Sequence, residues 1–375
     1  MPGDSGRGNS FGMSFIECAR YGYYKHVLGV VRPGPPPVAP HVGTAAHAYF
    51  DTVFKMFDQH ATKEDAKLQA MIEFERVLDS GDDGLDQTEL ENRAGKARMD
   101  ILPVWFENQW DKLERKVEVT IATEIDFVFF LPPEFRGMPI CRGSNQEACE
   151  AQGPEHKAVC LRRVTGRIDR VCQRNTDVYE EVDQLLNDAN PLLSRNGLSI
   201  QDFKTTSARS LKTYVADYLR SDQHLIYCLG WNRAAQYGGG VNRVMHQGHG
   251  NGDVPFADEI LYSMVRIDPS IKSISAMDFH DEPRLVQEVQ LDDCYERLCA
   301  LRAMLTAKWH EPPVMWTQNT SPSGPCNKFG HPCEFNQLCD QPGEWDKLIA
   351  PPLTECDHEE QAAYDYHLDP PVQPV

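Results

Sequence analysis

Apolar residues recur at three- and four-residue intervals through the first third of the chain, and this spacing predicts amphipathic helices. Each stretch places its apolar side chains on one helix face, as expected for helices that cover a common core. The predicted helices span residues 14–28, 43–59, 62–80 and 86–115. The first ends before a linker with four prolines, Val31–Pro37, because proline disfavours a helical conformation at the preceding residue.

The middle of the chain changes to short apolar or alternating segments, which are typical of strands. Strands are predicted near residues 117–130, 162–174, 177–182, 199–204, 240–246 and 258–267, and helices at 210–236 and 283–310. Residues 183–196 contain an Asn-Pro step and end in an Asn-Gly step, and they are predicted to form a loop. Interleaved strands and helices predict an α/β fold, a mixed sheet with helices on both faces and an amino-terminal helical region.

Length and composition set the expected domain organisation. With 375 residues, of which 41% are hydrophobic, the chain can bury a large core. One elaborated domain over residues 13–345 is expected, with its helical region at 43–115 and an insertion at about 131–161. Residues 1–12, rich in Gly and Ser, and the acidic, proline-containing tail at 355–375 are predicted to be disordered.

The charge balance is strongly acidic. A formal net charge of −19 argues against strong nonspecific attraction to nucleic acid. Part of this charge is local, because Glu355 to Asp369 includes six acids and no lysine or arginine. Basic residues concentrate beside two predicted strands: Arg162, Arg163, Arg167, Arg170, Arg174, Arg209, Lys212 and Arg220. Alternate strand residues face opposite ways, so only some of these can line one groove, and solvated surface positions are the alternative.

Two acids and a lysine on predicted strands form the first candidate for chemistry. Asp202 and Lys204 lie two residues apart, so their side chains share one face of a strand, and Asp169 supplies a second acid on another strand. Carboxylates hold Mg²⁺ or Mn²⁺ for phosphodiester hydrolysis, and a lysine beside the metal orients or deprotonates water and offsets phosphate charge. An isolated Asp-x-Lys pair is more often solvated surface charge.

Two helical motifs accompany these strands. Gln223 and Tyr227 lie four residues apart, on one helix face. His47 follows Gly43 by four residues in the first turns of a predicted helix. Taken alone, both His47 and Tyr227 are more often core residues than functional ones.

The order Gly-x-x-x-His, Gly-Arg-Ile-Asp, Asp-x-Lys-Thr, Gln-x-x-x-Tyr resembles the PD-(D/E)XK nuclease superfamily in its RecB-like branch. The opening segment at 14–21, with its Ser, Cys and aromatic residues, is similar to that branch as well, and the resemblance spans roughly residues 14 to 339. It implies a restriction-endonuclease-like fold. The implied roles are metal binding for His47, Asp169 and Asp202, catalysis for Lys204, and substrate-side contacts for Gln223 and Tyr227. The glutamate that some relatives add on the preceding strand would be Glu124, with Glu118 as competitor.

The cysteines give a second resemblance. A loop-like segment with Gly and Pro contains Cys326, Cys333 and Cys339. Cysteines that bind a metal through their thiolates are often placed on such loops. With Cys18 these three cysteines resemble the four ligands of a [4Fe-4S] cluster in the iron-sulfur nucleases of the RecB-like branch, which include CRISPR-associated and helicase-linked members. The last Cys-x5-Cys matches that pattern, whereas six residues rather than two separate the first pair of the trio. A Zn²⁺ site on the same four thiolates is the alternative, and His331 could replace Cys18 in such a site.

The remaining cysteines have simpler interpretations. Cys141, Cys149 and Cys160 are expected as free thiols, with a small zinc site as the alternative. Four others fall in apolar periodic segments and are predicted to be small buried residues: Cys172, Cys228, Cys294 and Cys299. No signal segment and no apolar run near eighteen residues is present in this sequence, so we expect a soluble, cytoplasmic chain with reduced cysteines and no membrane contact.

The function that this resemblance implies is a metal-dependent DNA nuclease, most readily an exonuclease acting on single-stranded or duplex ends in a bacterial or phage-infected cell. A helicase or recombination protein is the expected partner. A noncatalytic end-binding protein and an RNA-directed nuclease are the alternatives. The helical region 43–115 would form one wall of the substrate channel, where Trp105, Trp110 and the tyrosines of 21–24 either stack on bases or, as is more frequent for such residues, pack in the core.

Overall fold

The computed structural model describes residues 38–80, 84–131, 163–174, 198–207, 210–211, 214, 222–237, 257–275 and 278–308. The chain divides into two compact units, one formed by Met1–Gly34, Val128–Gly166 and Asp292–Val375, the other by Pro35–Phe127 and Arg167–Leu291. The second, called the sheet unit below, contains every candidate site residue that is described. The single domain expected over residues 13–345 stays a prediction.

Four helices form the amino-terminal part of the sheet unit, as the apolar periodicity predicts. They are α3 (Val38–Asp58), α4 (Lys63–Asp79), α5 (Gln87–Lys96) and α6 (Leu102–Glu114). Thr62 and Asp86 precede α4 and α5, and each side chain accepts a main-chain N–H of the first turn. Two predictions of extent were wrong: α3 begins five residues before residue 43, and a π-helical turn at Ala97–Ile101 interrupts the helix expected over 86–115.

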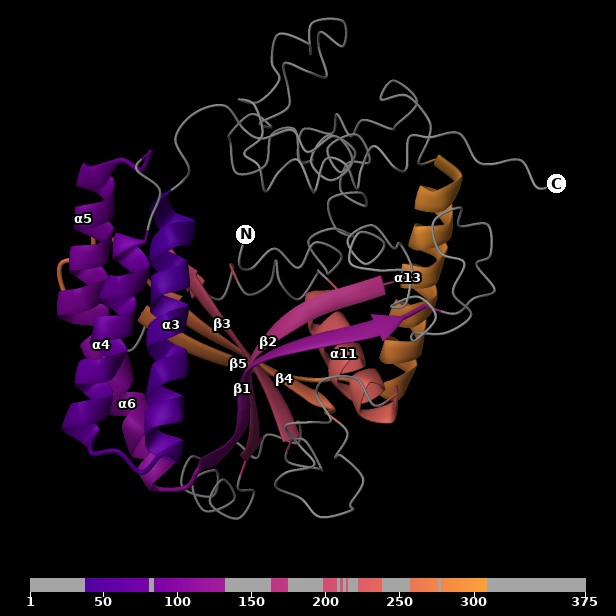
Figure 1. Ribbon diagram of the computed structural model, residues 1–375, viewed down its shortest axis with the longest axis horizontal. Coiled ribbons are helices and arrows are strands. Elements are labelled where there is room, and N and C mark those ends of the chain that lie inside the picture. Colours follow the sequence, from indigo (N-terminus) through magenta and orange to yellow (C-terminus); the bar gives the residue numbers. More distant parts are fainter. Residues whose placement is uncertain are drawn as a thin grey trace, which may run out of the picture. The chain divides into compact units, whose positions relative to one another are not determined.

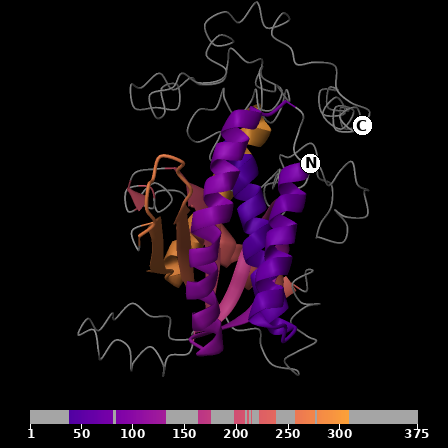
Figure 2. The same ribbon diagram turned by 90° about the vertical axis from the view of Figure 1, so that its left-hand side faces the viewer.

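The core of this unit lies between these helices and one face of the sheet (Figures 1 and 2). Phe203, on the sheet, packs against three rings of the helices, with ring centroids 5.0 Å away for Phe50, 5.8 Å for Phe54 and 6.0 Å for Trp105. Trp105 and Trp110 are both buried. The core interpretation of these two tryptophans is therefore confirmed, and base stacking on them is excluded by their burial.

Five strands form one mixed sheet: β1 (Glu118–Phe130), β2 (Arg163–Arg174), β3 (Leu198–Thr206), β4 (Glu259–Arg266) and β5 (Phe279–Leu285). Their spatial order follows the sequence, with β2 and β3 antiparallel, β3 and β4 parallel, and β4 and β5 antiparallel. The predicted mixed α/β fold is confirmed, and it agrees with a restriction-endonuclease-like architecture. The parallel pair needs a crossover, and α11 (Gln223–Tyr237) lies within that connection.

α11 packs on the sheet very closely. A Cβ atom at Gly230 would lie 2.4 Å from the ring of Phe127 on β1, so only glycine permits this approach. The ring of Tyr227, on the same helix, meets Phe127 with centroids 6.1 Å apart. Figure 1 shows α11 across the strands from α3, α4 and α6, so helices cover both faces as predicted.

β5 corrects the sequence analysis. Residues 283–285 were predicted to begin a long helix, but β5 pairs with β4 from Phe279 to Leu285, and α13 begins only at Glu288. The segment is polar and only half-buried, as an edge strand can be, and an edge strand also tolerates Pro283. The apolar period of α13 does not show where the helix begins, because local periodicity does not report pairing with a distant strand.

Several predictions lie outside the described residues. They are the helix at 14–28, the strands at 177–182 and 240–246, the insertion, both termini, and the cysteines Cys18, Cys141, Cys149, Cys160, Cys326, Cys333 and Cys339. Cys172, Cys228, Cys294 and Cys299 are buried, as predicted. Among the helices that the structure describes, none is long and apolar enough to cross a membrane.

Candidate metal centre and catalytic strand

The candidate site begins beside the end of a strand pair. The antiparallel register of β2 and β3 runs from Gln173 opposite Leu198 to Arg170 opposite Gln201. One residue further along β2, the side chain of Asp169 acts as an acceptor for β3: its Oδ2 accepts the N–H of Phe203 at 2.8 Å. This hydrogen bond fixes the Asp169 carboxylate against the segment of β3 that holds the Asp-x-Lys motif.

α3 brings His47 to the same carboxylate. His47 Nδ1 lies 3.4 Å from Asp169 Oδ2, and the imidazole meets the ring of Phe203 edge-on. The helix approaches β3 closely because residue 43 is glycine, since a Cβ there would lie 2.7 Å from Thr205 Oγ1. The Gly-x-x-x-His spacing therefore has a physical basis: glycine permits the contact, and histidine follows one helical turn later.

Glu124 completes a group of three potential ligands. One ligand atom from each of His47, Glu124 and Asp169 lies within 4.8 Å of the other two. Glu124 has φ of 49° inside β1, a left-handed conformation that is uncommon for residues other than glycine and that is often retained at functional sites. Burial, followed by the negative charges of Asp169 and Asp51, raises the pKa of Glu124 to about 7.

Asp202 and Lys204 form a contact pair on β3. Lys204 Nζ donates to Asp202 Oδ1 at 2.7 Å, and the Asp202 side chain is only 1% exposed. Asp202 Oδ2 is also buried, and no residue in the described part of the chain donates a hydrogen bond to it. Burial raises the pKa of Asp202 to about 6; the charge of Asp169 adds to this rise, and Lys204 opposes it.

The electrostatics of these acids fit a divalent cation. Burial disfavours ionised Asp169, but His47, Lys204 and the Phe203 N–H outweigh it and hold the pKa of Asp169 below its usual value. A negative charge is thus stabilised there, whereas the raised pKa values of Asp202 and Glu124 report uncompensated charge. A cation held by His47, Glu124 and Asp169 would offset this charge, and Asp202 is not among the three residues whose ligand atoms converge. Carboxylates suit Mg²⁺ and Mn²⁺, and imidazole is a common metal ligand.

The motif on α11 lies at this site as well. Gln223 Nε2 donates to Tyr227 Oη at 2.8 Å, which joins the two motif residues. Burial raises the pKa of Tyr227, and the negative charge of Asp202 raises it further. Tyr262 is opposite Asp202 in the parallel register. Burial and the negative charge of the same carboxylate raise the pKa of Tyr262. The charge of Asp202 therefore acts on one phenol of α11 and on one of β4, and Gln223 is the first residue of α11.

Arg170 and Glu118 belong to a buried network rather than to a substrate groove. Arg170 is fully buried, and its guanidinium donates to Glu118 at 2.7 Å and to Gln201 at 2.6 Å while it covers the ring of Phe54 at 4.0 Å. Interpreting Arg170 as a groove residue would therefore be wrong. Glu118 is committed to this ion pair, so the geometry favours Glu124 over its competitor as the acid on β1. Arg170 is also the β2 residue next to Asp169, and its bonds hold that part of the strand in place.

Arg167 has a different environment from Arg170. Its side chain is about half exposed and pairs with Asp126 and, at 3.3 Å, with Glu124. It is the only described residue of the predicted basic stretch that reaches an acid of the candidate centre.

Sequence reasoning missed one acid near the centre. Asp51 follows His47 by one turn of α3; its Oδ2 pairs with Lys55 at 2.5 Å, and its Oδ1 is buried with no hydrogen-bond donor among the described residues. Its charge contributes to the raised pKa of Glu124. The i, i+4 spacing from His47 was a signal that could have identified it.

Comparison with known proteins agrees with this geometry. Residues 13–183 match the sequence model of the PD-(D/E)XK nuclease superfamily, so this region is similar to proteins of that superfamily. No curated protein matches the chain. The matched segment includes His47, Glu124 and Asp169 but ends before Asp202 and Lys204. The assignment of those last two residues to the same site therefore depends on the geometry described above.

Proposed function

We propose that this protein is a metal-dependent nuclease that hydrolyses phosphodiester bonds of DNA. One observation carries the proposal: three potential ligands from α3, β1 and β2 converge within 4.8 Å, beside a buried Asp202 bonded to Lys204. An acidic surface cluster would not combine a buried, incompletely satisfied carboxylate with a lysine at 2.7 Å. The superfamily match over residues 13–183 supports the same reaction class.

His47, Asp169, Asp202 and Glu124 would hold one or two divalent ions. When bound, such an ion lowers the pKa of water and offsets the charge that develops on phosphate. Asp169 is prepared for this role, since His47 and the Phe203 N–H keep its carboxylate ionised and oriented. Asp202 would bind the ion and, in doing so, would give up part of its contact with Lys204.

Lys204 would be the catalytic lysine. Its side chain is 16% exposed, so the ammonium group borders the site while Asp202 fixes its position. From there it would orient the attacking water and stabilise the charge on the phosphate oxygens. Gln223, held by Tyr227, would contact the scissile strand from the opposite helix. Tyr227 would act as a positioning residue for that amide.

We further propose an exonuclease that acts on single-stranded or duplex DNA ends in recombination, repair or phage DNA metabolism, in the cytoplasm, with a helicase or recombination protein as partner. These finer points rest on the resemblance to the RecB-like branch. Degradation of DNA labelled at one end or internally, in linear and circular form, tests them. An exonuclease leaves circular DNA intact. On linear DNA it releases a label at one end at a different rate from a label at the other end.

Cys18, Cys326, Cys333 and Cys339 are proposed to hold a [4Fe-4S] cluster, with Zn²⁺ as the alternative metal. A ligand set that joins both ends of the chain would close a long loop and so restrict the unfolded state. Anaerobic purification followed by absorbance and iron analysis tests the assignment. A brown protein with iron supports the cluster, and a colourless protein with one zinc contradicts it.

The proposed reaction is tested by separating metal binding from chemistry. Lys204→Met should still bind Mn²⁺, because all four proposed ligands remain. It should lose cleavage by a factor of at least about 100, the lower end of single-residue electrostatic contributions. Mn²⁺ binding is measured by calorimetry and cleavage by gel. Cleavage at the wild-type rate by Lys204→Met would overturn the role of this lysine.

A further inference from the structure

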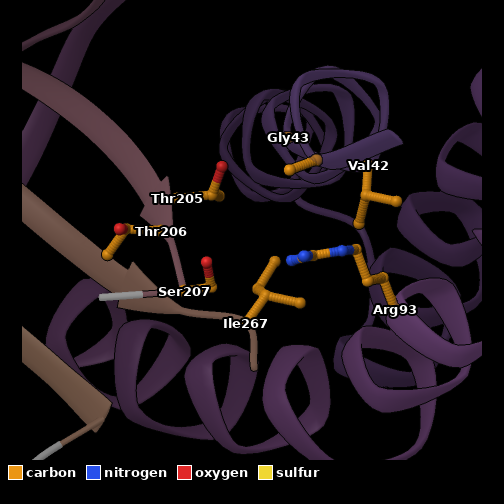
Figure 3. Close-up of a pocket in the computed structure, with 8 residues that line it drawn as sticks. Val42, Gly43, Arg93, Thr205, Thr206, Ser207 and Ile267 are labelled. Carbon is orange, nitrogen blue, oxygen red and sulfur yellow. The ribbon is translucent and has the colours of Figure 1, made fainter. Parts of the chain in front are cut away.

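A small pocket lies beside the candidate centre, between α3, α5 and the ends of β3 and β4. It has a volume of about 30 Å³ and is lined by Gly43, Arg93, Thr205, Ser207 and Ile267, among others. Figure 3 shows the guanidinium of Arg93 directed into this space, with the hydroxyl-bearing residues at the end of β3 across from it. The pocket therefore joins one cationic side chain to several hydroxyl groups.

The pocket is positioned by the same elements as the candidate centre. Thr205 directly follows Lys204 on β3, and Gly43 precedes His47 by one helical turn, about 5.4 Å along the helix axis. Thr205 and Ser207, two residues apart at the end of the strand, are both lining residues. Gly43 and Thr205, which approach each other closely where α3 meets β3, both line the pocket.

Arg93 has donors available for a ligand. Its Nε donates to Glu89 at 2.7 Å, which anchors the side chain on α5, and its two terminal nitrogens have no hydrogen-bond partner among the described residues. The side chain is 20% exposed, so the guanidinium is accessible from the pocket opening. The charge of Arg93 contributes to the lowered pKa of Asp268, but the Asp268 carboxylate already accepts two hydrogen bonds from Ser270. These donors are available to an acceptor that the described part of the chain does not supply.

The size and chemistry of the pocket select the ligand. A volume of about 30 Å³ accommodates one or two oxygen atoms, which suits one small anionic group at the pocket. A planar guanidinium presents parallel N–H groups that match two oxygens of one phosphate, and hydroxyls add further donors. An anion with several oxygens can accept hydrogen bonds from the terminal nitrogens of Arg93 and from the hydroxyls at the same time, which a single neutral carbonyl oxygen cannot do.

We propose that this pocket binds one phosphodiester group of the nucleic acid strand, next to the phosphate at the metal centre, and that Arg93 is its principal contact. This inference rests on the proposed nuclease function, because it assigns a second phosphate of the same substrate. Free phosphate has the same oxygens, so the test must separate the two sources. The contact would hold the strand in register while Lys204 and the carboxylates act on the neighbouring phosphate.

The test measures binding of a fluorescein-labelled single-stranded oligonucleotide to the full chain in EDTA, where metal-dependent cleavage does not interfere. The variants are Arg93→Gln, Arg93→Lys and the control Arg76→Gln. Arg76 is a matched control, since it is on α4 and its Nε donates to Glu73 at the same 2.7 Å but it does not line the pocket. Circular dichroism melting verifies that each variant is folded.

Arg93→Gln should weaken binding about tenfold and make the slope of log K against log salt concentration less steep by about 0.7, the value for one phosphate contact on a single strand. Arg93→Lys should keep the slope and lose affinity several-fold, because an ammonium group cannot form the paired bonds of a guanidinium. Arg76→Gln should change neither. Arg93→Gln with the affinity and slope of the wild type overturns the proposal.

A series of oligonucleotides with one neutral methylphosphonate at successive positions identifies the contacted group. One position should weaken binding to the wild type and have no further effect on Arg93→Gln. If every position affects both proteins equally, or if only inorganic phosphate competes at Arg93, the phosphodiester assignment is wrong. Cleavage is measured separately with Mn²⁺. Binding without cleavage contradicts the nuclease proposal alone, and cleavage with an indifferent Arg93 contradicts only the pocket.

Discussion

Replacing Gly230 with alanine is expected to destabilise the protein and to displace the helix that carries Gln223 and Tyr227. Gly230 lies where α11 packs directly on the ring of Phe127. An added Cβ would lie 2.4, 2.5 and 2.6 Å from three carbons of that ring. Ordinary carbon contacts are about 3.5–4.0 Å, so the helix or the ring must move by about 1 Å. Phe127 is buried, and the ring has little room to turn.

The magnitude follows from two opposing effects. Overpacking of a core costs about 1–3 kcal/mol, while alanine is better than glycine in a helix by roughly 1 kcal/mol. The expected result for Gly230→Ala is a net loss of up to about 2 kcal/mol in the free energy of unfolding. Gly95, on α5, is the matched control: an added Cβ there meets no atom within 4 Å. Gly95→Ala should therefore gain about 0.5–1 kcal/mol.

Urea unfolding followed by circular dichroism measures both changes in the full chain. The midpoint should fall for Gly230→Ala and rise for Gly95→Ala. The double variant Gly230→Ala/Phe127→Leu should recover part of the loss, which a double-mutant cycle reports as a coupling between the two sites. A midpoint for Gly230→Ala that rises as far as that of Gly95→Ala would refute the close packing of α11, and with it the placement of Gln223.

Further predictions concern the metal site, its pH dependence and the buried network. Glu124→Gln should weaken Mn²⁺ binding by tenfold or more in calorimetry. Glu73→Gln is the control, because the Glu73 side chain has the same 28% exposed fraction and one arginine partner, and it should not weaken binding. Equal losses in the two variants would contradict the site. The Mn²⁺ affinity of the wild type should fall as the pH falls below about 7. Glu124, with its pKa raised to about 7, must release its proton to bind the metal. A pH-independent affinity would contradict this role. Arg170→Met should lower the free energy of unfolding in urea by about 3–5 kcal/mol, because Glu118 is left as a buried unpaired charge. The double variant Arg170→Met/Glu118→Leu should recover most of this loss. An Arg170→Met protein as stable as the wild type would show that the pair is not needed.

Local pattern predicted most of the described fold. The helices of the sheet unit bury an apolar face that repeats along the sequence, and β3 and β4 are short segments buried at almost every position. Local pattern failed where a distant partner decides the structure. β5 is polar, and its strand conformation comes from pairing with β4. The π-helical turn at Ala97–Ile101 and the positive φ of Glu124 are likewise set by packing, and no residue type at these positions announces them.

The candidate site was predictable to the extent that its chemistry is local. Asp202 and Lys204 are two apart on one strand, and the 2.7 Å contact follows directly from that spacing. Arg170 was not predictable in this way, because its buried partners Glu118 and Gln201 come from other strands. The pocket at Arg93 was missed for the same reason, since α5 contributes the cation and β3 the hydroxyls.

Degradation of end-labelled DNA in the presence of Mn²⁺ tests the central claim most directly, with the wild type compared with Asp202→Ala and with Asp100→Ala. Asp100 is the control because it is an exposed acid whose only described partner is Lys96, bonded at 2.7 Å. The proposal predicts that the wild type and Asp100→Ala remove the label only when Mn²⁺ is present, and that Asp202→Ala remains folded and leaves the DNA intact. Cleavage by Asp202→Ala at the wild-type rate would contradict it.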